Sequence, residues 1–161
     1  MSDYSTGLTG DINLSDVVSV LESYLPARHW TNSDTTLRSY TNAISSPTQV
    51  HGSSFAITAA ADSLYVLTGI IMVSASSVND TWEFHPSEDD GPSVSHKSYF
   101  TAMGTATHGK HLAIPVRGIW ENLSAGSVTI DVDTGSTSAA SGTLYSLARY
   151  FDLLEFKKRS S

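Results

Sequence analysis

The residues best spaced for chemistry form the run Gly104-Thr-Ala-Thr-His-Gly109-Lys110-His111. Its first seven positions match a phosphate-binding loop, in which backbone amides and a lysine hold the phosphates of a nucleotide. The eighth position has His111 where that loop needs a serine or threonine hydroxyl to bind magnesium. The loop should also open a helix, whereas residues 112–117 contain Pro115 and are typical of a strand. The run therefore does not predict nucleotide hydrolysis.

Histidines and acidic residues are also spaced in ways that suggest metal binding. His108 and His111 could share a metal with His85 or His96. In a strand, however, residues three apart point to opposite faces of the sheet. The acidic turn at residues 88–90 lacks the alternate ligand spacing of a calcium loop. We therefore expect no metal and no cofactor.

The sequence also lacks a clear catalytic group for hydrolysis. It contains no Gly-x-Ser-x-Gly turn that would present a nucleophilic serine. Paired carboxylates near strands are a second possibility, and the candidates are Glu83, Glu121, Asp131 and Asp133. Asp131 and Asp133 alternate with Val128, Ile130 and Val132, so we expect the two carboxylates on the solvent face of a strand. No catalytic residue is predicted, and we expect that the protein is not an enzyme.

The charge of the chain excludes some partners. The formal net charge is -7, and residues 1–156 carry 6 basic against 16 acidic groups, or -10. Such a body repels the phosphates of DNA and RNA. The absence of cysteine is compatible with folding in a reducing cytoplasm. The longest apolar run, residues 64–73, is about half the length that spans a bilayer as a helix, so we expect no membrane contact.

Most of the chain is typical of strands. Alternating or short buried apolar runs occupy residues 55–59, 64–73, 82–84, 99–100, 111–120, 127–133 and 143–156. Pro115 indicates an edge position or a bulge for the strand that contains it. About eight strands at this spacing predict an all-β fold, an antiparallel β-sandwich or jelly roll.

The N-terminal part differs from the rest of the chain. The sequence predicts a short arm followed by one helix at residues 14–25, which Pro26 ends. Its apolar face consists of Leu14, Val17, Val18 and Leu21. This face either packs on its own domain or anchors the chain to a partner. We therefore divide the chain into an arm and helix at 1–35 and a β-sandwich domain at 36–161.

The final strand is apolar on both faces. Strict alternation places Tyr145, Arg149, Phe151 and Leu153 on one face and Tyr150 on the other. Two apolar faces indicate burial on both sides. The domain's own core covers one face, and either a neighbouring subunit or a loop of the same chain covers the second. The five residues are the predicted subunit interface.

Three segments carry a resemblance to a known family: Ser53 to Leu67, Leu123 to Val132 and Ala148 to Phe156. Through them, residues 48–158 resemble the trimeric jelly-roll modules, of the tumour-necrosis-factor and C1q type, that occur in the virion proteins of tailed bacteriophages. The resemblance implies a homotrimer in which the final strand lines the threefold axis.

The resemblance also implies a role in the virion, after synthesis in the host cytoplasm. Such modules serve as capsid decoration (cement) proteins, which bind the major capsid protein or another virion protein, or as fibre components that bind a host-surface receptor or glycan. The short stretch before the β region favours decoration, with the helix as the anchor. For the alternative, Trp82 and Trp120 are the aromatic side chains that we expect to be exposed for binding.

Overall fold

The computed structural model describes residues 25–41, 43, 45–76, 81–89, 98–101, 111–121, 123–137 and 142–157. These residues form ten strands in two antiparallel sheets and contain no helix. The predicted all-β antiparallel sandwich is therefore confirmed. The helix predicted from Leu14, Val17, Val18 and Leu21 lies outside the described residues. No helix in the described part is long and apolar enough to cross a membrane.

Sheet A has five strands. Its order is β1 (Arg28–Asp34), β10 (Leu144–Lys157), β5 (Ser63–Ala75) and β8 (Leu112–Trp120), and the short β2 (Arg38–Tyr40) also pairs with β10. The central pair, β5 and β10, runs antiparallel over thirteen registered positions. Since β8 ends the described sheet, the edge position predicted from its proline is confirmed.

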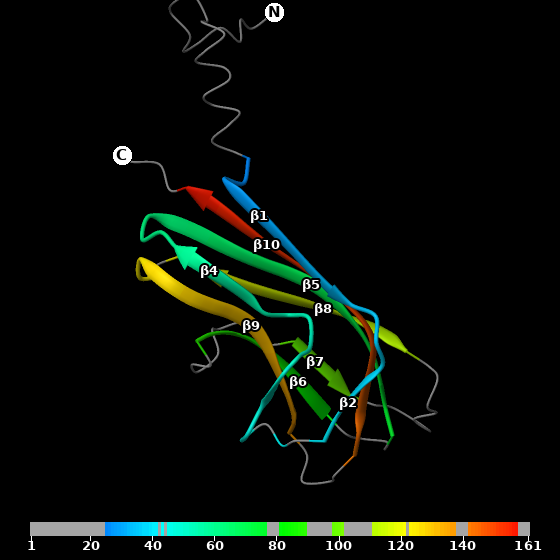
Figure 1. The fold of residues 1–161 in the computed structure, drawn as a ribbon. Helices are drawn as coiled ribbons and strands as arrows, with labels where there is room; N and C mark the ends of the chain where they lie inside the picture. The colour runs from blue at the N-terminus through cyan, green and yellow to red at the C-terminus, as the bar shows by residue number, and fades with distance from the viewer. Residues whose placement is uncertain are drawn as a thin grey trace, which may run out of the picture.

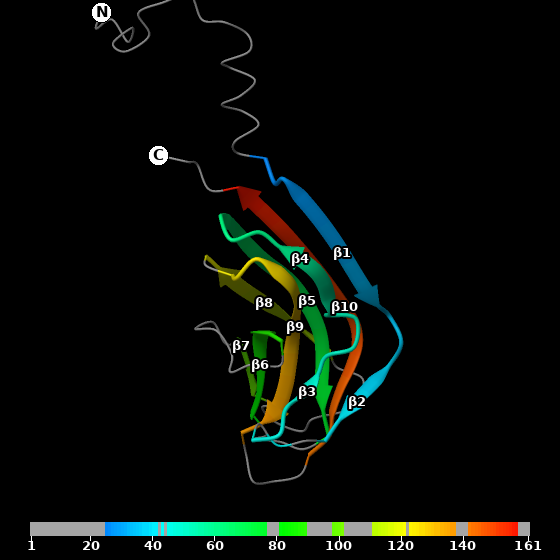
Figure 2. The same ribbon diagram turned by 60° about the vertical axis from the view of Figure 1, so that its left-hand side comes forward.

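Sheet B has the order β3 (Thr48–Gln49), β9 (Gly126–Ser136), β6 (Thr81–Glu88) and β7 (Ser98–Thr101), and β4 (Phe55–Ala59) also pairs with β9. The chain crosses between the sheets from β2 to β3, from β4 to β5, from β5 to β6, from β7 to β8, and at each later connection. Figures 1 and 2 show the two sheets as facing layers, which is the arrangement of a jelly roll.

The core lies between the sheets and follows from the alternation in the sequence. Strand β4 buries every second residue, with Phe55 and Ile57 at 5% and 6% exposure. Opposite side chains of β9 continue this pattern, since Phe55 pairs with Ile130 and Ile57 with Val128. Because successive side chains of a strand point to opposite faces, each such run supplies one wall of the core.

Two glycines allow aromatic rings to lie directly on the backbone of sheet A. A Cβ atom added to Gly69 of β5 would stand 2.1 Å from Cδ1 of Phe151, whose ring covers the glycine. A Cβ on Gly118 of β8 would stand 2.5 Å from Cη2 of Trp120 and 2.7 Å from Cβ of Pro86 in sheet B. Side chains at these positions would force the rings away and separate the sheets.

Strand β1 lies on the N-terminal side of the predicted domain boundary but belongs to the β-sandwich. Sheet A begins at Arg28, on the arm side of the boundary expected after residue 35, and β1 pairs with β10 along its full length. The segment lacks alternating apolar residues because it is an edge strand, and only Trp30 packs against the core. The β-sandwich therefore includes residues 28–34, which the prediction had assigned to the arm.

Candidate functional site

The side chains of sheet A that point away from sheet B form an exposed, largely apolar surface on β10, β5 and β8, which we call the outer face. Strand pairing brings them side by side, because Tyr150 of β10 lies opposite Ile70 of β5, and Ile70 lies opposite Pro115 of β8. Ile70 and Tyr150 are 48% and 52% exposed. The apolar members of the outer face are Leu64, Val66, Ile70, Met72, Ala113, Pro115, Ile119, Tyr145, Ala148, Tyr150, Leu154 and Phe156, and its polar members include Thr68, Arg117 and Asp152.

An irregularity in β10 changes the predicted subunit interface. The register with β5 shifts between Ser146 and Ala148, so Tyr145 and Tyr150 both lie on the outer side. Strict alternation had placed these two tyrosines on opposite faces. The other three predicted residues are buried inside this single chain, at 0–1% exposure, and they are Arg149, Phe151 and Leu153. Of the five predicted interface residues, only Tyr145 and Tyr150 therefore lie where a neighbouring subunit could contact them.

Arg149 holds the end of β1 instead. Its guanidinium donates to Asp34 Oδ2 at 2.6 Å, and also to the carbonyl oxygen of Thr36 at 2.8 Å and that of Ser146 at 3.0 Å. Asp34 also accepts hydrogen bonds from Arg38 and from the backbone amide of Thr36, at 3.2 and 2.7 Å. The Thr36 amide lowers the pKa of the Asp34 carboxyl well below its ordinary value. The carboxylate is thus kept charged beside the buried cation.

Glu155 holds the other end of β1. Its buried carboxylate accepts hydrogen bonds from Ser63 Oγ at 2.7 Å and from Tyr65 OH at 3.2 Å, and it forms an ion pair with Arg28. Burial raises the pKa of this carboxyl, but the bonds from Arg28 and Ser63 outweigh it and lower the pKa below 4.5. Strand β1 is thus fixed to β10 at both ends by charged groups.

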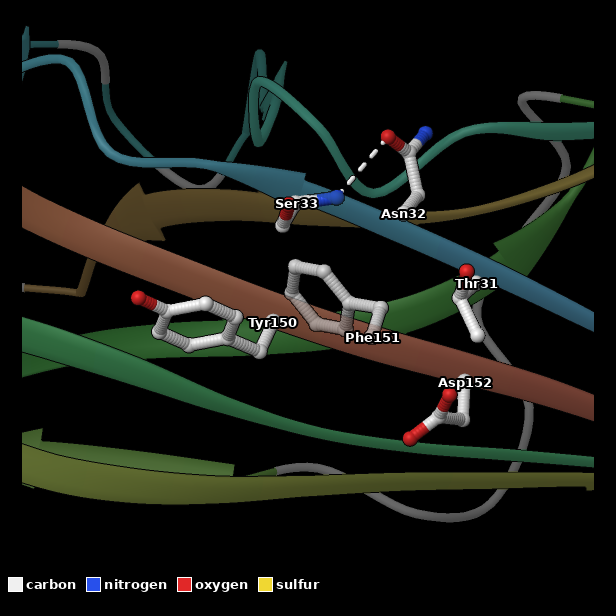
Figure 3. A pocket seen from close by; sticks show the side chains of 6 residues that line it. All are labelled: Thr31, Asn32, Ser33, Tyr150, Phe151 and Asp152. Atoms are coloured by element: carbon white, nitrogen blue, oxygen red, sulfur yellow. Dashed lines mark hydrogen bonds between the residues drawn. The ribbon is translucent and has the colours of Figure 1, made fainter.

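A hollow of about 380 Å³ lies along the seam between these two strands. It is lined by Thr31, Asn32, Ser33, Tyr150, Phe151 and Asp152. Figure 3 shows Thr31 and Ser33 on β1 and Tyr150 and Asp152 on β10 around it. Asp152 Oδ1 lies 2.9 Å from Nε2 of His29. The hollow thus combines hydroxyl groups, a carboxylate and an exposed aromatic ring, a set suited to binding a polar ligand.

Sheet B carries a second polar group, whose two aspartates were predicted to be solvated. They do lie on the side away from the core, but Asp131 and Asp133 are only 1% and 9% exposed. Ser87 hydrogen-bonds to both carboxylates, and Gln49 Nε2 donates to Asp131 Oδ2 at 2.5 Å. The prediction of solvated carboxylates was therefore wrong, because polar side chains of the neighbouring strands cover them.

The remaining sequence candidates are accounted for as follows. Trp82 and Trp120 were expected to be exposed, but they are core residues at 0% and 4% exposure. No group of three metal-binding side chains is close enough to hold an ion within the described residues. The glycine-rich run at 104–110, together with His96 and His108, lies outside the described residues.

No family model matches this chain, and no curated protein matches its sequence. Solved structures do match. The Eiger TNF of S. frugiperda has 12% sequence identity and a TM-score of 0.50, covering 84% of this chain and 96% of that one. The fold is a TNF-like jelly roll.

Two further solved structures are similar to the chain. The tripod (BppUct-A-L) from the baseplate of bacteriophage Tuc2009 has 11% identity and a TM-score of 0.46, covering 99% of this chain and 77% of that one. The globular domain of zebrafish complement 1qA has 12% identity and a TM-score of 0.42, covering 81% and 96%. At 12% identity, the similarity to the Eiger TNF establishes the fold alone.

Proposed function

We propose that this chain is a non-enzymatic structural protein of a virus particle, a homotrimeric capsid decoration protein that binds the major capsid protein and stabilises the head. Two observations support this. The resemblance of residues 48–158 to phage virion modules suggests the setting. The apolar outer face of sheet A, which supports the self-association, is the observation that carries the proposal.

The outer face has the character of a protein interface. Its apolar side chains form rows across β10, β5 and β8, since Tyr150, Ile70 and Pro115 lie side by side, as do Leu154, Val66 and Ile119. A polar row of Asp152, Thr68 and Arg117 separates these two rows. Large exposed apolar surfaces with interspersed polar residues are typical of sites of protein association. A second copy of the same chain is the natural cover, because a closed ring of copies buries the face of every member. The trimer is the closed ring that the resemblance suggests.

The predicted anchor joins the sandwich away from the middle of this face. Strand β1 begins opposite the end of β10, because Arg28 pairs with Glu155 (Figure 1). The segment that precedes β1 is therefore attached at one end of the sandwich. Self-association and binding to the capsid would use different parts of the chain. Deleting residues 1–26 should then abolish binding to particles while the trimer remains intact, and unchanged particle binding would refute the anchor.

The copy number of this chain in purified particles tests the proposal as a whole. A decoration protein should be present in numbers comparable with those of the major capsid protein. Far fewer copies would favour the alternative, a receptor- or glycan-binding component of a tail or head fibre. Complete absence from the particles would refute both. The alternative is kept because the hollow between β1 and β10 has the chemistry of a ligand site.

A further inference from the structure

We propose that Arg117 of one copy forms an ion pair with Asp152 of the neighbouring copy, and that this pair fixes how two outer faces meet. The pair presupposes the self-association of the chain proposed above, and it adds which strands of the two copies come together. It follows from the level of the two charges on the face, from the partners that they have within one chain, and from symmetry.

A polar row crosses the outer face between two apolar rows. Asp152 of β10 lies opposite Thr68 of β5, and Thr68 lies opposite Arg117 of β8. Within the bounds of these three strands, Arg117 and Asp152 are the charged side chains of the outer face. The face therefore has a negative charge toward β10 and a positive charge toward β8, at the same level along the strands.

Each of the two charges can accept a partner from outside the chain. Thr68 stands between them, so their Cα atoms are two strand spacings, roughly 10 Å, apart. Arg117 is exposed and makes no hydrogen bond or ion pair with the residues that the structure describes. The side chain of Asp152 is 51% exposed, and its Oδ1 lies 2.9 Å from Nε2 of His29. Its Oδ2 has no partner in the described part of the chain and can accept from a second donor.

A second copy that covers the outer face takes both charges out of water. A charge that is buried in an interface without a counter-charge strongly disfavours association. Arg117 and Asp152 therefore each need an opposite charge on the covering surface. When that surface is the outer face of another copy, it supplies one charge of each sign.

The positions of the charges select one arrangement of the copies. If the symmetry axis runs along the strands, each row meets the same row of the neighbour, and the β10 side of one copy meets the β8 side of the next. Asp152 then lies against Arg117. If the axis runs across the strands, β10 meets β10, and Asp152 faces Asp152 of the neighbouring copy. The apolar rows match in both arrangements, so the charged row favours the axis along the strands.

A closed ring of copies around such an axis leaves no charge unpaired. Each copy presents Asp152 to one neighbour and Arg117 to the other, because the two residues lie toward opposite sides of the face. A trimer would contain three identical ion pairs at one level. The polar row thus contributes specificity to a surface whose apolar rows alone would not distinguish the arrangements.

Charge reversal tests the pair. Arg117→Glu and Asp152→Arg should each weaken self-association by about tenfold or more, because like charges then meet at every contact. The double variant Arg117→Glu/Asp152→Arg should regain the mass of the original chain, since the two signs are merely exchanged. The matched control is Asp62→Arg, which makes the same change of charge in an exposed turn and should associate as the original chain does. Light scattering during size-exclusion chromatography measures the masses.

A mixture of the two single variants shows that the contact joins different copies. At a concentration where Arg117→Glu alone and Asp152→Arg alone are single chains, the mixture should have a higher mass. In a mixed ring of three copies, two of the three contacts join opposite charges. A pair formed within one chain could not produce this recovery.

The pattern of masses decides the outcome. If the original chain associates but both single variants associate equally well, or if neither the double variant nor the mixture recovers, the ion pair is refuted while self-association stands. A single chain for the original protein would instead refute the self-association itself, and the ion pair with it. The two failures are therefore distinguishable.

Discussion

The buried guanidinium of Arg149 lies 2.6 Å from the carboxylate of Asp34, and this pair joins the edge strand β1 to the central strand β10. Arg149 has 0% exposure, so its charge depends on partners inside the protein. Its other contacts are neutral oxygens of Thr36 and Ser146. The pair therefore neutralises a buried charge and positions the strand that carries Thr31 and Ser33.

Removing the carboxylate should destabilise the fold strongly. In Asp34→Ala the guanidinium stays buried without a counter-charge, which is among the costliest single changes in a protein. We expect a clear fall in the urea midpoint of unfolding. The control Asp62→Ala, in an exposed turn, should change the free energy of unfolding by no more than about 0.5 kcal/mol. Equal midpoints for the two variants would show that the pair is not needed for stability.

The contact of Phe151 with Gly69 gives a second prediction. Gly69→Ala places a methyl group 2.1 Å from Cδ1 of Phe151 and 2.8 Å from the carbonyl oxygen of Tyr150, so the ring and the backbone must move. We expect a loss of about 1–3 kcal/mol in the free energy of unfolding, as for other overpacked cores. Thr68→Ala, at the exposed neighbouring position, serves as the control. Denaturant unfolding measures both, and a neutral Gly69→Ala would contradict the packing described.

Glu155 should make the stability dependent on pH. Its folded-state pKa is lowered below 4.5, so its contribution is fully present above the unfolded pKa and is lost as the pH falls through the folded value. Asp34 acts in the same direction, because its pKa is also lowered. We therefore expect the urea midpoint to fall as the pH drops below about 4.5.

The variant Glu155→Gln separates the two contributions. It keeps the size of the side chain but cannot be charged, so it should be less stable at neutral pH and lose less stability on acidification. Unfolding curves at neutral and acidic pH measure the difference. A variant with the same pH dependence as the original chain would show that Glu155 contributes nothing to it.

Much of the fold could be predicted from the sequence because most strands bury one face. The alternation at residues 55–59 and 127–133 gave the correct inward residues, and Pro115 correctly indicated an edge strand. Strand β1 was missed for the same physical reason. An edge strand with Trp30 as its core contact carries almost no hydrophobic period.

The candidate site was predicted less well, because it depends on register and on contacts across the sheet. The shift between Ser146 and Ala148 moves Tyr145 to the same side as Tyr150, and a bulge of this kind has no clear signal in one sequence. The two apolar faces of the final strand suggested an interface that included Arg149, whereas the structure pairs Arg149 with Asp34, far away in the sequence. Only the strand order brings these two residues together.

Self-association is tested most directly by the molecular mass of the protein in solution, measured by light scattering during size-exclusion chromatography. We predict three chains for the original protein and one chain for Ile70→Glu, which places a charge in the middle of the outer face. The control Ala56→Glu, at an exposed site on sheet B, should remain a trimer. A single chain for the original protein, or an intact trimer for Ile70→Glu, would contradict self-association through the outer face of sheet A.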